Sequence, residues 1–163
     1  MASWCRLAKA LIQAITVEIA QLDLLFATYA DLLAHVQQQA PDVVELAALA
    51  TVLHSFYNGT ESMFLAVARQ VDQHVPDAPR WHRTLLAQMV RPGTVRPALI
   101  TAPLEARLLD YLAFRHYFRH AYAFTLDWAR LQPLVLVLPS VYAALRDELT
   151  TFLQFLAAQP ESE

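Results

Sequence analysis

The chain has 163 residues, of which 56% are hydrophobic and 17% are charged, and its net charge is −3. Two glycines cannot build a glycine-rich phosphate loop, and a single cysteine allows no internal disulfide bond. The longest stretches without a charged residue, 46–60 and 131–145, are shorter than the roughly 17–25 residues of a membrane-spanning helix. This composition predicts a cytoplasmic helical protein that does not enter a membrane. Its surplus of apolar residues favours an oligomer.

Two long helices are expected in the first half of the chain. Apolar residues recur at helical spacing along 3–39, which predicts one continuous helix. A second helix is expected over 41–71, with Asp42 and Glu45 favourably placed at its positive N-terminal end. Because the apolar period continues on both sides of Gly59, this glycine is expected to allow close packing rather than to break the helix. A short link makes the pair an antiparallel hairpin.

Three further helices complete the predicted fold. A short one is expected over 80–91, a central one over 103–124 and a long one over 127–158, with prolines marking the breaks between them. The fold class is therefore all-α: an antiparallel bundle of about four long helices plus a short one. We expect a single domain over 1–158 and a frayed tail over 159–163.

Charge is distributed unevenly along the chain. Residues 78–130 contain eight arginines and three acidic residues, a net charge of +5, whereas the rest of the chain has a net charge of −8. An arginine-only basic segment on an acidic body is typical of a surface that faces a polyanion. Arg83, Arg91 and Arg96 are candidates for such contacts. Pairing of these arginines with acidic helices of the same chain or of a partner explains the pattern equally well.

The central helix carries an unusual charged cluster over 115–122, which contains two arginines, two histidines and two tyrosines. On a helical wheel Arg115 projects from the apolar stripe, so it must meet a carboxylate, a cleft or a bound anion. Tyr122 would lie two turns further along the same face, and His120 lies ~140° away. Either the helix end distorts, or two copies of the cluster face each other across a dimer.

The residues of this cluster could serve several kinds of chemistry. His116 and His120 have the spacing of two metal ligands, but Arg115 and Arg119 would repel a dication, so no metal site is expected. RNA cleavage needs no protein nucleophile, because the substrate supplies its 2′-hydroxyl group. His120 could then act as general acid or base and Arg115 could stabilise the transition state. Glu61 is a candidate site carboxylate or an ion-paired helix residue. An arginine- and histidine-rich structural interface is the alternative.

The motif Arg115-x4-His120-x-Tyr122 resembles the Arg-x4-His-x-Tyr motif of the HEPN ribonuclease toxins, specifically their HepT-like branch. Similar flanking segments occur at 57–61, 81–89 and 114–116. HEPN proteins often have Asn or Asp directly after the motif arginine, where this chain has His116. Whether His116 joins the chemistry or orients Arg115 is left open.

The resemblance implies a HEPN-like helical bundle that forms a homodimer through the motif helix. It implies a metal-independent endoribonuclease without a cofactor, which cleaves RNA, with tRNA the expected class, and leaves 2′,3′-cyclic phosphate ends. Arg115 and His120 take the catalytic positions. A supporting set would assist or contact the RNA: His116, Arg119, Glu61, Arg83, Arg91 and Arg96.

The resemblance also implies a protein partner. This partner is a minimal nucleotidyltransferase antitoxin that transfers AMP from ATP to Tyr122, which would place negative charge beside Arg115. The alternative function is a non-catalytic helical module that assembles with a nucleotidyltransferase or another partner.

Overall fold

The structure is a computed structural model that describes residues 2–122 and 125–159. The regular structure of these residues is helical and contains no strand, which confirms the all-α prediction. The helices are α1 (Ala2–Thr28), α2 (Ala30–His35), α3 (Val43–Val67), the π-helical turn η1 (Ala68–Asp72), α4 (Trp81–Val90), α5 (Ala102–His120) and α6 (Trp128–Ala157).

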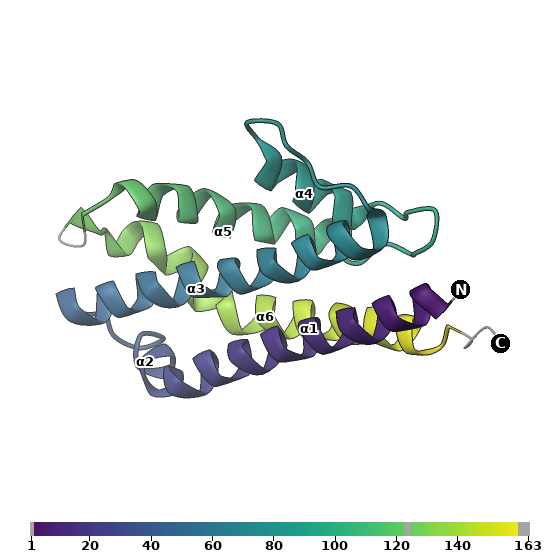
Figure 1. Ribbon diagram of the computed structural model, residues 1–163. Helices are drawn as coiled ribbons and strands as arrows, with labels where there is room; N and C mark the ends of the chain where they lie inside the picture. The colour runs from purple at the N-terminus through teal and green to yellow at the C-terminus, as the bar shows by residue number, and fades with distance from the viewer. Residues whose placement is uncertain (1, 123–124, 160–163) are drawn as a thin grey trace.

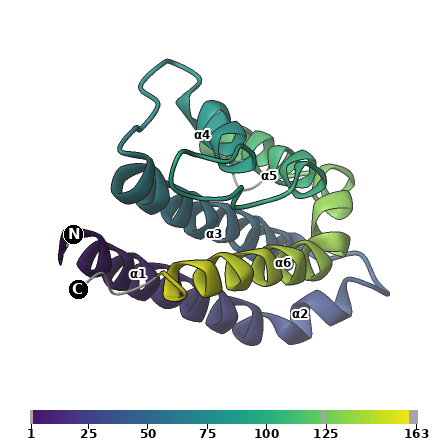
Figure 2. The same ribbon diagram turned by 90° about the vertical axis from the view of Figure 1, so that its right-hand side faces the viewer.

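Helix α3 lies in the middle of the bundle, and one hydrophobic core surrounds it. It packs against α1, α4, α5 and α6, and buried residues recur along it from Leu49 to Val67. Figure 2 shows α4 and α5 on one side of α3, with α1, α2 and α6 on the other. The N-terminal end of α1 and the C-terminal end of α6 lie close together at one end of the bundle (Figure 1). Side chains projecting from α3 can therefore meet groups from most of the other helices.

The N-terminal hairpin differs from the prediction in two details. The single helix expected over 3–39 is wrong at Tyr29, where the chain leaves helical geometry between α1 and α2. The Thr28 hydroxyl donates a hydrogen bond of 2.7 Å to the Leu24 carbonyl, an arrangement that bends helices. Asp42 is the N-cap of α3, where it forms a capping box with Glu45, so α3 begins at Val43.

Gly59 lies inside an unbroken α3, as predicted from the continuing apolar period. A Cβ atom at this position would lie 3.0 Å from Leu22 Cδ2, which is closer than normal packing allows. The glycine therefore lets α1 approach α3, and this contact fixes the spacing of the hairpin.

The central helix is shorter than the predicted 103–124. α5 ends at His120, and the chain is extended at Ala121 with φ −99° and ψ 144°. The helical wheel consequently does not describe Tyr122, and residues 123–124 lie outside the described part of the chain. Helix α6 then starts after the N-cap Asp127 and continues through two prolines. Except for Gln159, the predicted tail at 159–163 also falls outside the described residues.

Helices α1 and α6 are joined by a polar contact at the surface of the bundle. Asp23 accepts hydrogen bonds from Arg146 and from the Tyr142 hydroxyl group. The Arg146 guanidinium, followed by the Tyr142 hydroxyl, lowers the pKa of the Asp23 carboxyl.

By length and composition alone, the stretches Arg6–Thr28 of α1 and Trp128–Ala157 of α6 are apolar enough to cross a membrane.

Candidate functional site

Arg115 meets a carboxylate from the central helix of the bundle. Its Nη1 atom lies 2.7 Å from Oε1 of Glu61, which projects from α3 towards α5. The Glu61 side chain is only 7% exposed and the Arg115 side chain 15%. A guanidinium in an apolar stripe requires such a partner, because an unpaired buried charge is strongly destabilising. The sequence-based requirement for a partner thus leads to Glu61, 54 residues earlier in the chain.

His82 on α4 completes a three-residue cluster with Glu61 and Arg115. Its Nδ1 atom lies 2.6 Å from Oε2 of Glu61 and 3.4 Å from Nη1 of Arg115. An ionised carboxylate can only accept a hydrogen bond, so Nδ1 of His82 carries the proton in this contact. The Trp81 ring stacks on His82 with centroids 3.6 Å apart. His82 was noticed in the sequence only as part of the flanking Trp81-His82-Arg83 segment, without a role.

Glu61 uses only part of the hydrogen-bonding capacity of Arg115. Both contacts of the guanidinium are made by Nη1, and Nε is buried without a partner in the described part of the chain. Buried donors are normally paired, so an unpaired one is a candidate contact for a water, an ion or a ligand. A planar guanidinium with unused donors can bind phosphate oxygens.

His54 is a second partly buried side chain near Arg115 that sequence reasoning missed. Its Nε2 atom lies 2.9 Å from the Asn58 amide nitrogen, and its Nδ1 atom is buried without a partner among the described residues. Burial, followed by the positive charges of Arg115 and Arg119, lowers the pKa of His54. The ring is therefore neutral at pH 7. No short-range sequence signal links His54 to the motif, because it projects from α3 next to Phe118 of α5.

The other motif residues gather at the C-terminal end of α5. The rings of His116 and His120 meet edge to face with centroids 5.0 Å apart, beside a hollow of about 340 Å³ that Tyr117 and Thr125 also line. Tyr122 follows the helix and is 73% exposed, and its carbonyl accepts hydrogen bonds from Thr125. The chain thus holds Arg115 in the middle of α5, with Glu61 and His82, and His120 at its exposed end.

Arg83 and Arg91 are exposed on α4, whereas Arg96 is buried. Arg96 makes two hydrogen bonds of 2.6 and 2.7 Å to Asp72 and three to backbone carbonyl groups. These bonds engage every nitrogen of its guanidinium within the chain, which does not favour the RNA contact predicted for Arg96. Arg119 is exposed on α5. In the described part, no three metal-ligating side chains come together.

A family model described as HepT-like protein matches residues 48–156, two thirds of the chain. The chain belongs to the HepT-like family. The match extends from the start of the buried part of α3 to the end of α6, and so includes every residue of the cluster around Arg115. The HepT-like family belongs to the HEPN superfamily, whose members are generally ribonucleases. Searches of curated proteins and of solved structures found no match to this chain.

Proposed function

We propose that this HepT-like chain is the RNA-cleaving toxin of a HEPN and nucleotidyltransferase pair, acting in the cytoplasm without a metal ion or cofactor and away from membranes. The observation that carries the proposal is Arg115, held by buried Glu61 while other donors of its guanidinium stay unused. Such a group suits a phosphodiester, whose charge increases at the transition state. The proposed substrate is RNA, with tRNA the expected class.

In the proposed reaction, the 2′-hydroxyl oxygen of RNA attacks the adjacent phosphorus atom and the bond from phosphorus to the 5′-oxygen breaks. One general base removes the 2′-hydroxyl proton, and one general acid donates a proton to the leaving 5′-oxygen. The products are a 2′,3′-cyclic phosphate and a 5′-hydroxyl end. His120 is proposed for one of these proton transfers, because it is exposed and lines an open hollow at the end of α5. Arg115 stabilises the phosphorane charge.

The proposed active unit is a homodimer. His120 and Arg115 occupy the end and the middle of α5, respectively, and only Arg115 is held against α3 and α4. A second copy with its motif helix facing the first would bring the His120 of each chain towards the Arg115 of the other. His116, whose ring meets that of His120 edge to face, would then orient the His120 ring.

The proposed antitoxin modifies Tyr122, whose exposure supports access by a second protein. The phenolic oxygen attacks the α-phosphorus of ATP, pyrophosphate leaves, and the phenolic proton passes to a base of the transferase. The product is an AMP ester next to the motif, which adds negative charge and bulk where the substrate phosphate would bind.

The second candidate function is a non-catalytic module that binds a partner. It is favoured by one observation: Glu61 already neutralises Arg115, as a purely structural ion pair would.

RNA cleavage by the purified chain, with and without EDTA, decides between the two functions. The proposed ribonuclease cleaves tRNA in EDTA, leaves cyclic phosphate ends, and loses about 10²–10⁴-fold in rate in His120→Ala. Arg107→Ala, which removes an exposed arginine from the same helix, is the control and keeps the rate. No cleavage by the unmodified wild type, or cleavage that His120→Ala retains, would contradict the proposed mechanism.

A further inference from the structure

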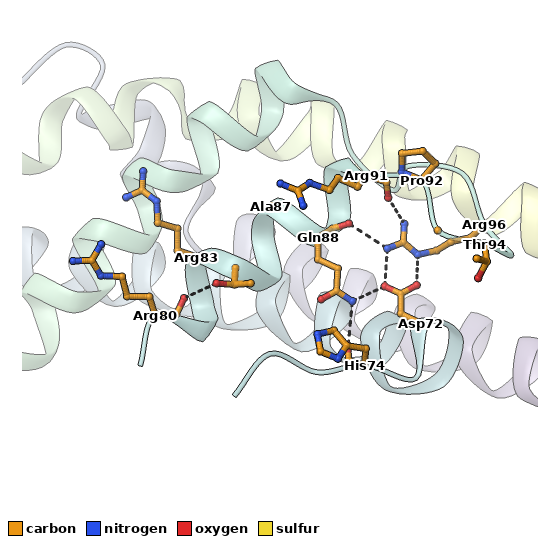
Figure 3. A pocket seen from close by; sticks show the side chains of 12 residues that line it. Asp72, His74, Arg80, Arg83, Ala87, Gln88, Arg91, Pro92, Thr94 and Arg96 are labelled. Carbon is orange, nitrogen blue, oxygen red and sulfur yellow. Dashed lines mark hydrogen bonds and ion pairs between the residues drawn. The ribbon is translucent and has the colours of Figure 1, made fainter. Parts of the chain in front are cut away.

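A hollow of about 570 Å³ lies beside α4 (Figure 3), and its lining does not include Glu61, His82 or Arg115. We call it the α4 hollow and define it by Arg80, Arg83, Gln88, Arg91, Arg96 and Asp72, which line it together with smaller residues. It is formed by α4, by the end of η1 and by the loop that follows α4. Four arginines and one aspartate give its lining a net charge of +3 with His74 neutral.

The floor of the α4 hollow is held by hydrogen bonds within the chain, and these bonds pair its one carboxylate, Asp72, with Arg96. Asp72 receives two hydrogen bonds from the buried Arg96 and one of 2.7 Å from Gln88. Arg96 also binds the carbonyl groups of Gln88, Arg91 and Pro97, which ties the loop after α4 to the helix. The charge of Asp72 is therefore balanced by Arg96, so it does not repel an anion in the hollow. The loop after α4 is held in place without a ligand.

The wall of the α4 hollow consists of three arginines with free guanidinium groups. Arg80, Arg83 and Arg91 are exposed, and none of them forms an ion pair with a carboxylate in the described part of the chain. Arg80 is the N-cap and Arg91 the C-cap of α4, and Arg83 lies in its first turn; Thr84 and Ala87 line the hollow beside them. Figure 3 shows the Arg80 and Arg83 side chains together at one end, with Arg91 extending towards the middle.

Helix α4 connects this wall to the candidate catalytic cluster. Leu85, Leu86 and Met89 anchor the helix in the core, and His82 projects inwards to Glu61 and Arg115. His82 and Arg83 are consecutive residues, so the cluster and the wall of the hollow adjoin at the N-terminal end of α4.

We propose that the α4 hollow binds the phosphate backbone of RNA next to the segment that is cleaved. The inference rests on the proposed ribonuclease function and adds a second contact region to it. Arg80, Arg83 and Arg91 make the phosphate contacts, whereas Arg96 is a positioning residue that shapes the hollow. Phosphate contacts of this kind do not depend on base sequence and weaken as salt increases.

The test measures RNA binding separately from cleavage. The anisotropy of a fluorescein-labelled oligouridylate is titrated with the full chain carrying His120→Ala, at several salt concentrations. In this background, Arg83→Ala/Arg91→Ala is expected to weaken binding at least about tenfold and to lower the salt slope by about 1.4, roughly 0.7 for each lost contact with a single strand. Arg83→Lys/Arg91→Lys keeps the positive charge and most of the slope.

The matched control is Arg69→Ala/Arg107→Ala, which removes two exposed arginines outside the α4 hollow and should weaken binding less than about twofold. Equal weakening by the two double alanine variants would overturn the proposed site, as would unchanged binding by Arg83→Ala/Arg91→Ala. Displacement of the RNA by ATP or inorganic phosphate at low concentration would overturn it in favour of a small-anion site. RNA binding at the hollow by a wild type that does not cleave would refute the ribonuclease function alone.

Discussion

Glu61 is expected to stabilise the whole bundle, and Glu61→Gln tests this directly. The carboxylate accepts from Arg115 Nη1 at 2.7 Å on one oxygen and from His82 Nδ1 at 2.6 Å on the other. A glutamine amide has only one acceptor oxygen, and its NH₂ group would face a second donor. The variant therefore loses one charged hydrogen bond, weakens the other, and leaves the guanidinium without its counter-charge.

The size of the loss follows from burial. Hydrogen bonds to charged groups contribute about 1.5–3 kcal/mol each, and breaking a buried ion pair costs about 3–5 kcal/mol. Arg115 remains 15% exposed, which places the cost at the lower end, about 3 kcal/mol. In a domain of this size, each kcal/mol lowers the melting temperature by about 2–4 °C, so Glu61→Gln should melt about 6–12 °C below the wild type.

Thermal melting and urea unfolding, both followed by circular dichroism, measure the change. Asp147→Asn removes an exposed carboxylate from the middle of α6 and should stay within about 0.5 kcal/mol of the wild type. Arg115→Met should cost less in the Glu61→Gln background than alone, because the two residues share one interaction. The reasoning is refuted if Glu61→Gln melts with the wild type, or if Arg115→Met costs the same in both backgrounds.

Three further predictions concern other parts of the bundle. Because the pKa of His54 is lowered in the folded chain, the unfolded chain binds a proton at this residue first, and His54 reduces the stability of the fold as pH falls below about 6.5. The melting temperature of His54→Gln should therefore change less between about pH 7.5 and 5.5 than that of the wild type. The control His74→Gln, which replaces an exposed histidine, should keep the pH dependence of the wild type. Asp42→Ala removes the capping box of α3 and should cost about 1 kcal/mol in urea unfolding. Arg96→Met strands the carboxylate of Asp72 and should cost about 3 kcal/mol, with hydrogen exchange increased in the loop after α4.

The sequence predicted the helix boundaries correctly where the apolar periodicity ends at a proline or glycine signal. Proline-bounded α4 was expected within one residue at each end, and α3 was expected to continue through Gly59. The end of α5 was missed because apolar residues continue at helical spacing beyond His120 and no glycine or proline follows it. The break at Tyr29 was missed because the apolar period continues through it. The hydrogen bond from the Thr28 hydroxyl to the Leu24 carbonyl leaves that period unchanged.

The partners of Arg115 show a second limit of sequence reasoning. Physical chemistry required that this guanidinium meet a carboxylate, a cleft or an anion, but it could not select the partner, because helical spacing relates only residues on one helix. Glu61 and His82 lie on two other helices, 54 and 33 residues away, and packing against α3 brings them together. In the sequence, Glu61 and His82 belonged to segments that resemble the HepT-like branch, but only the structure shows that their side chains contact Arg115.

The early end of α5 changes the reason for expecting a site shared by two chains. On an uninterrupted helix, Tyr122 would share the face of Arg115, and only the angle to His120 would argue for a second copy. Instead, Ala121 is extended and Tyr122 is exposed beyond the helix, so the proposed switch residue belongs with His120 at the open end. Arg115 stays partly buried against α3 and α4, where it is paired with Glu61. Modification of Tyr122 would therefore obstruct the approach of a second motif helix, and of RNA, more directly than it would alter the ion pair of Arg115 within its own chain.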